Sequence, residues 1–235
     1  MKFFDMTNLL AKNSYPGRGI ALGLCPDGRT AALVYFIMGR STASRSRVFF
    51  RSGDDVMIRL LGGANPSDPS LILYAPVRTL DGATIVANGD QSDTIRDALR
   101  HGSTFEKALQ TRTFEPDAPH FTPRISGLLD FSGGFSYRLS ILKPGGDKGL
   151  STLRGIYDYV PLPGAGHFIH TYQKDASPLP GFTGDPLPIN IPADLDAFAD
   201  DIWAALDGEN KVSLYVRFTD IASGAYTDRL INKYD

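Results

Sequence analysis

Short apolar runs separated by turn residues dominate the first part of the chain. Six runs are rich in Val, Ile, Leu, Phe or Tyr, and each predicts a β-strand: residues 19–24, 31–38, 47–50, 56–61, 71–77 and 84–87. Turn-forming steps separate several of them, at Pro26-Asp27-Gly28, Ser52-Gly53-Asp54 and Asp81-Gly82. We therefore expect consecutive strands without a helix between each pair.

A helical period replaces this pattern at three places. Residues 93–101 carry Ile95 and Leu99 four positions apart, and residues 105–110 repeat that spacing. The clearest predicted helix covers residues 193–206, whose apolar face is formed by Leu195, Phe198, Ile202 and Leu206. Pro192 stands where a first-turn proline belongs.

The predicted order of elements is strands, two helices, strands, a helix and a last strand before a short tail. The later strands are expected at residues 125–131, 135–142, 153–160, 166–172 and 212–218. This order favours an α+β fold, with antiparallel or mixed sheets and helices on their outer faces. A four-layer αββα sandwich satisfies it, and so do other α+β folds. We expect one domain over residues 1–235, with an N-terminal extension at 1–14 and a Pro-rich loop or extended crossing at 177–192.

Composition and charge exclude several classes of protein. The chain has 235 residues, of which 42% are hydrophobic, and its net charge is −2. A nucleic-acid-binding protein would normally show a strongly basic face, so we expect no nucleic-acid partner. No apolar stretch approaches the roughly 20 residues that span a bilayer, and no signal peptide is evident. The single cysteine, Cys25, fits a reducing, cytoplasmic setting.

Residues 39–51 carry the clearest chemical signal. They read GRSTASRSRVFFR, with four arginines and four hydroxyl residues directly after an apolar run. Because guanidinium groups bind phosphate or carboxylate in a bidentate manner, the segment predicts an anionic ligand. A polar strand edge in contact with solvent is the alternative. Composition does not separate the four arginines; the family resemblance given below selects Arg40 and Arg45, with Ser41, and leaves Arg47 and Arg51, which continue into the β-run, to the sheet edge.

Two further segments have polar residues at junctions. In residues 86–95 a strand ends, an Asn-Gly step turns the chain and a helix begins. Such a junction can bind a ligand through free backbone N–H groups and nearby side chains, but taken alone it favours ordinary helix capping by Asp90, Ser92 or Asp93. Residues 114–125 form a Pro-stiffened loop that carries Glu115 and Arg124, either as site residues or as solvated charges. Tyr74 lies in a mostly apolar run, where a tyrosine hydroxyl usually finds a partner.

Several familiar site motifs are absent from the sequence. There is no Walker P-loop, no strand–GxGxxG–helix motif, no CxxC pair and no GxSxG elbow. His167 and His170 are three apart, which in a strand places them on opposite faces, so we expect no metal site there. Cys25 has no evident base, and we interpret it as structural.

The ordered set of motifs resembles the stand-alone, archaeal-type IMP cyclohydrolases. The matching elements are Tyr15-Pro-Gly-Arg18, Gly39-Arg40-Ser41 with Arg45, Leu73-Tyr74, Asn88-Gly-Asp-Gln-Ser-Asp-Thr-Ile95, and Phe114-Glu115 ahead of Thr122-Pro-Arg-Ile125. The resemblance is good over residues 15–131 and weak in the C-terminal half.

This resemblance implies an activity and a set of roles. The family converts 5-formamidoimidazole-4-carboxamide ribonucleotide to IMP and water on a fold like that of the N-terminal-nucleophile hydrolases, without metal or organic cofactor. It implies Tyr74, Glu115 and Arg45 as catalytic residues. It further suggests substrate binding by Arg40, Ser41, Asn88, Asp90 and Arg124, and a homotetramer.

The chain also departs from the family. Residues 1–14 precede the Tyr15-Pro-Gly-Arg18 motif, where archaeal members begin almost at once, and the C-terminal half is longer. No Ser, Thr or Cys nucleophile stands at the family's start, so we expect no autoprocessing. A non-catalytic purine-nucleotide-binding protein and an amide hydrolase related by fold remain the alternatives.

Overall fold

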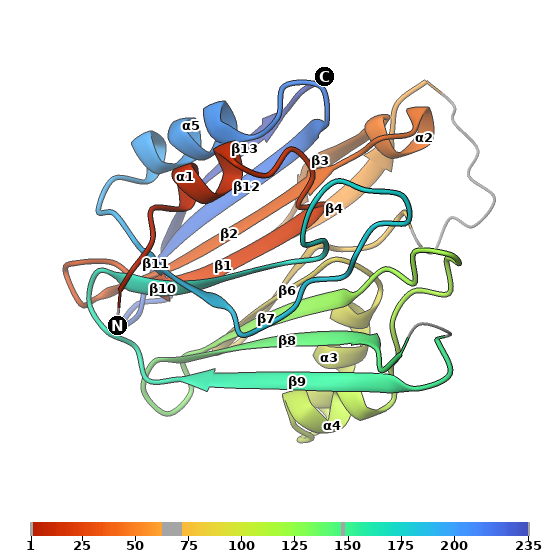
Figure 1. Ribbon diagram of the computed structural model, residues 1–235. Helices are drawn as coiled ribbons and strands as arrows, with labels where there is room; N and C mark the ends of the chain where they lie inside the picture. Colours follow the sequence, from red (N-terminus) through yellow and green to blue (C-terminus); the bar gives the residue numbers. More distant parts are fainter. Residues whose placement is uncertain (1, 63–71, 147–148, 235) are drawn as a thin grey trace.

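The strands of the computed structural model, which describes residues 2–62, 72–146 and 149–234, form two antiparallel sheets that face each other (Figure 1). The first sheet contains β1 (Arg18–Leu24), β2 (Thr30–Met38), β10 (Ala165–His170), β11 (Leu187–Asn190), β12 (Lys211–Asp220) and β13 (Tyr226–Asn232). Its spatial order is β11-β10-β1-β2-β12-β13.

The second sheet has seven strands, and they are consecutive in both sequence and space. They are β3 (Arg47–Ser52), β4 (Asp55–Leu60), β5 (Val77–Leu80), β6 (Ala83–Ala87), β7 (Arg124–Asp130), β8 (Ser136–Pro144) and β9 (Thr152–Tyr159). Each strand pairs antiparallel with the next. The sheet is thus a meander with β3 at one edge and β9 at the other.

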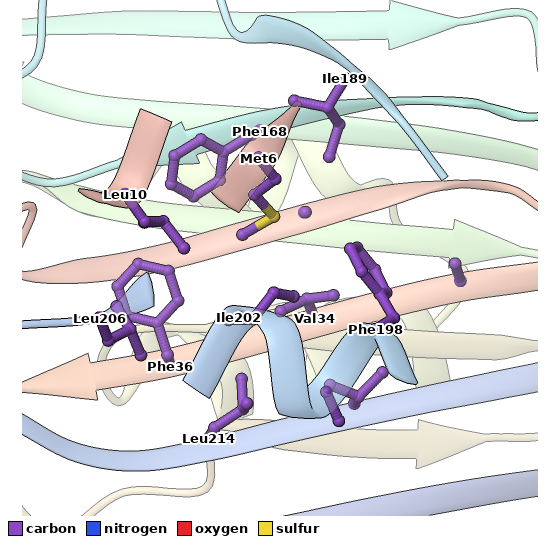
Figure 2. Close-up of a cluster of buried hydrophobic side chains, with 14 of the residues drawn as sticks. Met6, Leu10, Val34, Phe36, Phe168, Ile189, Phe198, Ile202, Leu206 and Leu214 are labelled. Atoms are coloured by element: carbon purple, nitrogen blue, oxygen red, sulfur yellow. The ribbon is translucent and has the colours of Figure 1, made fainter. Parts of the chain in front are cut away.

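Helices cover the outer face of each sheet. Side chains of α1 (Met6–Ala11) and α5 (Leu195–Ala205) pack on the six-stranded sheet (Figure 2). Side chains of α3 (Gln91–Arg100) and α4 (Phe105–Gln110) pack on the seven-stranded sheet. A single turn of helix, α2 (Thr42–Arg45), follows β2. The order of layers is therefore helix, sheet, sheet, helix.

The central strand β2 shows why the layers form. Val34 and Phe36 point to the helix-covered face, whereas Leu33, Tyr35 and Ile37 point between the sheets. Successive strand residues face opposite ways, so a strand covered on both faces must be apolar almost throughout. The uninterrupted run of residues 31–38 meets this requirement.

The structure confirms the α+β class, and most of the expected elements are present. The helix predicted at 105–110 is α4 with the same bounds, and the helix predicted at 193–206 is α5, which starts after the Asp194 cap instead of at Pro192. The extension at 1–14 contributes α1, whose N-cap is Asp5. How the chain divides into domains remains an expectation.

Three local predictions were wrong. The strand expected at 71–77 begins only at Val77, because residues 72–76 form turns and bends that end in Pro76, which has no N–H to donate; residue 71 lies outside the described residues. The Pro-rich segment at 177–192 contains the edge strand β11, where Pro188 is tolerated. The expected short tail forms β13, which pairs with β12 over residues 226–232.

Candidate active site

Several strand ends meet at one end of the sandwich, where a charged pair is buried. Arg18 begins β1, and its Nη2 lies 3.5 Å from Oε2 of Glu115, whose side chain is 4% exposed. Arg18 Nε and Glu115 Oε1 are also buried, and neither has a hydrogen-bond partner in the described part of the chain. Most buried polar groups are paired, so a donor and an acceptor left open side by side mark a candidate ligand site.

Burial changes the protonation behaviour of this pair. It raises the pKa of the Glu115 carboxyl above its ordinary value, and the nearby Arg18 guanidinium opposes that shift without cancelling it. Burial alone would lower the pKa of Arg18, but the attraction of Glu115 raises it well above its ordinary value and keeps the guanidinium charged. Glu115 is consequently suited to exchange a proton beside a fixed positive charge.

Two tyrosine hydroxyls lie beside the pair. The hydroxyls of Tyr35 and Tyr74 are 2.9 Å apart, and both side chains are buried. Burial raises the pKa of Tyr35 well above its ordinary value, and the charge of Tyr74 adds to this. Tyr74 also lies close enough to Arg18 and Arg47 to influence their pKa values. The tyrosine pair thus belongs to the same polar cluster.

Arg47 is the second buried arginine of this cluster. It is 2% exposed and donates to the backbone carbonyls of Ser44 (2.9 Å) and Met38 (3.0 Å). Arg47 lies on the edge strand β3, as expected. Its side chain is buried, however, so it does not have the solvent-exposed role that was predicted for it at the sheet edge. Burial lowers its pKa, and Tyr74 opposes this shift. Arg51, in contrast, is half-exposed and pairs with Asp228.

The loop after Glu115 forms one wall of the cluster. The backbone N–H of Glu115 donates to the carbonyl of Thr122 (2.9 Å), and the hydroxyl of Thr122 lies 2.5 Å from that of Tyr172. The Tyr172 ring stacks on Tyr15 at 5.8 Å between centroids. The guanidinium of Arg40 lies 5.0 Å above the Tyr15 ring, so Arg40 sits on the outer side of this stack.

Arg40 is itself held at the surface. Its Nη1 donates to Asp175 Oδ1 at 2.8 Å and to the Ala176 carbonyl at 3.1 Å. The Arg40–Tyr15–Tyr172 stack therefore runs from solvent to the wall formed by Thr122.

Asn88, Asp90 and Arg124 form a second wall. The Asn88 amide donates to the Pro123 carbonyl (2.9 Å) and accepts from the Ile125 N–H (2.8 Å), which joins the ends of β6 and β7. Asp90 occupies the N-cap position of α3, but its side chain makes no capping hydrogen bond; its carboxylate accepts from Arg112 and, at 2.6 Å, from Arg124. Arg124 in turn influences the pKa of Glu115. Asp90 and Arg124 are therefore neighbours of the buried pair.

Ser41 and Arg45 lie apart from these walls, in and before α2. Ser41 caps that helix in a reciprocal capping box with Ser44. Arg45 Nε donates to the Gly39 carbonyl (2.9 Å), and Nη2 donates to Asn210 Oδ1 (3.1 Å). Within the described residues neither side chain has a hydrogen bond to Glu115 or Tyr74. Their expected parts in catalysis and binding remain predictions.

The sequence analysis did not single out Arg18, Tyr35, Arg47 or Tyr172 as site residues. Arg18 was part of a quoted motif, and a charge directly before an apolar strand was the available signal. Tyr35 and Tyr172 lie in apolar strand patterns that resemble ordinary core. Nothing local distinguishes them, because only the pairing of the two sheets brings Tyr35 to Tyr74.

Other candidate groups are structural. Cys25 is 2% exposed, and burial raises its pKa to about 12, so it is not an activated nucleophile. His167 Nδ1 lies 2.8 Å from the Tyr137 hydroxyl between the sheets, whereas His170 stacks on Phe168 on the other face, which confirms the opposite orientations. Across the described ranges no group of three His, Cys, Asp or Glu residues is placed to hold a metal ion.

An α+β sandwich with an incompletely paired Arg–Glu cluster at its strand ends defines a candidate small-molecule enzyme. Residues 15–224 match the family of IMP cyclohydrolase-like proteins, and the chain belongs to this family. It is 32% identical over 164 residues to the IMP cyclohydrolase of Methanopyrus kandleri, covering 63% of this chain and 78% of that protein. The resemblance found in the motifs is thereby confirmed, and the match extends into the C-terminal half. None of the described helices is long and apolar enough to cross a membrane.

Proposed function

We propose that this protein is an IMP cyclohydrolase, which converts 5-formamidoimidazole-4-carboxamide ribonucleotide to IMP and water in purine biosynthesis. The observation that carries the proposal is the open pair formed by Arg18 Nε and Glu115 Oε1, a donor beside an acceptor. A primary carboxamide offers the complementary groups, an N–H to Glu115 and a carbonyl oxygen to Arg18. Family membership supports the same substrate.

Ring closure needs no external nucleophile. The carboxamide nitrogen attacks the formyl carbon, a C–N bond forms, and one proton passes from that nitrogen to the former formyl oxygen. The resulting carbinolamine loses its hydroxyl group and the proton of the formamido nitrogen as water, which leaves the aromatic ring. An enzyme must fold the substrate, move these protons and stabilise charge on oxygen.

The cluster contains groups suited to each task. In this proposal Glu115 accepts the carboxamide proton, and its raised pKa favours returning a proton to the departing water. Tyr74, held by Tyr35, orients the formyl group and takes part in proton transfer. Arg45 stabilises the oxyanion, as the family resemblance suggests, and the buried Arg47 adds positive charge beside Tyr74.

The outer residues are proposed to hold the rest of the nucleotide. Arg40, Ser41 and Arg124 bind the phosphate or carboxamide, and Asn88 and Asp90 contact the ribose or base. Supporting this, Arg124 and Asp90 adjoin Glu115, and Arg40 lies on the solvent side of the tyrosine stack. The likeness to N-terminal-nucleophile hydrolases, the homotetramer and the cytoplasmic location also belong to this proposal. No cofactor is invoked.

Two alternatives make different demands. An amide hydrolase would need an activated nucleophile, and the buried Cys25 thiol, with its pKa raised to about 12, does not supply one. A non-catalytic purine-nucleotide-binding protein would bind the substrate or IMP without turnover.

The deciding experiment is a turnover assay. Purified protein, treated with chelator, should convert the formylated ribonucleotide to IMP, followed by the ultraviolet change of ring closure and by chromatography of the product. Binding of IMP in calorimetry without any turnover would instead establish the nucleotide-binding alternative, and a rate no higher than that without protein would refute the proposed activity.

A further inference from the structure

Exposed apolar side chains concentrate at one edge of the molecule. Nine large hydrophobic side chains are exposed within the described residues. Five of the nine lie between residues 150 and 162: Leu150, Leu153, Ile156, Val160 and Leu162. Leu150 is 87% exposed and Val160 is 85% exposed. Scattered single residues of this kind are normal, but a cluster on one strand and its two ends marks an interaction surface.

This cluster follows β9, the last strand of the seven-stranded sheet. Figure 1 shows β9 as the outermost strand at the lower edge of that sheet. An edge strand carries a row of backbone N–H and C=O groups without partners in its own sheet and so offers a template for pairing with another strand.

The opposite edge of the same sheet is treated differently. On β3 the backbone N–H of Phe49 donates to Asn232 Oδ1 at 2.9 Å, and the Phe49 carbonyl accepts from Asn232 Nδ2 at 3.1 Å. A side chain of β13 thus covers that edge. Over residues 152–159, by contrast, the structure as described places no such bond from another element on the β9 backbone.

The sequence around β9 is complementary to itself. An antiparallel pairing of two copies centred on Ile156 sets Arg154 of one copy opposite Asp158 of the other, twice, and Leu153 opposite Tyr159. The same register brings Leu150 toward Leu162 of the second copy. Opposite charges and apolar pairs at facing positions stabilise antiparallel strand pairs.

Arg154 and Asp158, the two charged residues of this register, also have partners within their own chain. Arg154 donates to the carbonyls of Leu109, Gln110 and Arg112 at the end of α4, and Asp158 Oδ1 lies 3.5 Å from Arg138 Nε. Arg154 and Asp158 are both exposed on the outer face of the strand.

From these observations we propose that two copies of this chain associate edge to edge through β9, antiparallel, across a two-fold axis at Ile156. The seven-stranded sheets of the two copies then continue into one another. The proposal concerns assembly and does not depend on which reaction the protein catalyses.

Mass measurement by light scattering during size-exclusion chromatography tests the proposal. Ile156→Lys places two like charges at the two-fold axis and should halve the mass of the wild-type assembly. Phe50→Lys is the matched control, because Phe50 and Ile156 are both 37% exposed and lie on opposite edge strands of one sheet. A monomeric wild type, or a mass unchanged by Ile156→Lys, overturns the proposal. Should Ile156→Lys fail to fold by circular dichroism, the charge-exchange variants described next make the test on the same register.

A charge exchange separates the interface from contacts within one chain. Arg154→Asp sets like charges opposite each other and should lower the mass. The double variant Arg154→Asp/Asp158→Arg should restore it, although both variants lose the same bonds to α4. Failure of the double variant to recover the wild-type mass would show that the register centred on Ile156 is wrong.

Discussion

The two ends of the sandwich each bury an arginine, but they treat it in opposite ways. At the far end, Arg217 is 2% exposed, and its three nitrogens donate to the Tyr215 hydroxyl (2.7 Å), Thr79 Oγ1 (2.9 Å) and the Asp54 carbonyl (2.5 Å). The bonds to Thr79 and Asp54 join the two sheets, whereas Tyr215 lies on the same strand as Arg217. At the site end, Arg18 Nε has no partner in the described chain, and its nearest carboxylate is 3.5 Å away.

The pKa values of the carboxylates at the two ends, Asp228 and Glu115, are shifted in opposite directions. Burial would raise the pKa of Asp228 at the far end, but hydrogen bonds from Arg51 and Tyr215 lower it below its ordinary value. Burial raises the pKa of Glu115, and no hydrogen bond from the described residues lowers it. One end is therefore arranged to satisfy its polar groups and stabilise the fold. At the other, Arg18 Nε and Glu115 Oε1 have no hydrogen-bond partner in the described part of the chain, as the proposed site requires.

The largest effect that this comparison predicts is on Glu115. Glu115→Gln keeps the shape of the side chain but removes its capacity to accept a proton. Loss of a general acid–base group typically costs 10²–10⁴-fold, so we expect kcat to fall at least about 100-fold, near 2.7 kcal/mol of barrier. Steady-state assays of ring closure measure this. A loss below tenfold would remove Glu115 from the proton-transfer steps.

A stability measurement completes that test. The variant Arg18→Met/Glu115→Gln replaces an incompletely paired ion pair with neutral side chains, and such replacements are often neutral or stabilising. We expect its free energy of unfolding in urea to match the wild type within about 1 kcal/mol while activity is lost. Strong destabilisation would mean that the site pair holds the fold together after all.

The far end should respond in the opposite way. Arg217→Met removes three hydrogen bonds, two of which reach the other sheet, and we expect the free energy of unfolding to fall by about 2 kcal/mol. Turnover by the remaining folded protein should stay within about twofold of the wild type, because Arg217 lies at the other end of the strands. A large drop in kcat with unchanged stability would reverse the roles assigned to the two ends.

The elements were predictable where one period dominates. Residues 31–38 and 105–110 carry uninterrupted strand or helix patterns, and both formed as expected. The predictions failed near prolines. Because of Pro188 and its neighbouring prolines, the edge strand β11 was predicted as a loop or extended crossing, and the apolar residues before Pro76 were predicted as a strand but form turns and bends. Local composition could not reveal that Pro188 occupies an edge position, since that depends on the order of strands in the finished sheet.

The site was predictable in part, for a related reason. Glu115, Asp90 and Arg124 stand in polar segments, and the structure brings them together. Arg18 and Tyr35 lie on the apolar strands β1 and β2, and they gain polar partners only when the segments before β5 and β7 bring Tyr74 and Glu115 beside them. Contacts between residues far apart in sequence have no local signal, so the sequence could not predict that Arg18 and Tyr35 belong to the buried part of the site.

A smaller catalytic effect is expected at Tyr74 and Arg45. Tyr74→Phe removes a hydroxyl at the cluster, and Arg45→Ala removes the guanidinium proposed to stabilise the oxyanion. Each should lower turnover at least about tenfold, near 1.4 kcal/mol. Unchanged kinetics in both folded variants would exclude them from the site. A response at Tyr74 alone would favour Arg47, whose pKa Tyr74 influences, as the charge that acts there.

The smallest effect compares two tyrosines that face each other across neighbouring strands. Tyr35 on β2 lies directly opposite Tyr215 on β12, and both rings are fully buried between the sheets. The hydroxyl of Tyr35 lies 2.9 Å from that of Tyr74, whereas the hydroxyl of Tyr215 donates to Asp228 and accepts from Arg217. Their variants should therefore separate function from stability at adjacent positions.

Tyr35→Phe should lower kcat by about threefold, near 0.7 kcal/mol. The reason is that the Tyr74 hydroxyl loses the partner that holds it in place. Tyr215→Phe should leave kcat unchanged and lower the free energy of unfolding by about 1–3 kcal/mol, since Arg217 and Asp228 each lose a partner. A kcat of Tyr35→Phe equal to that of the wild type would show that Tyr35 only fills space, and the functional asymmetry of the two ends would then begin at Tyr74.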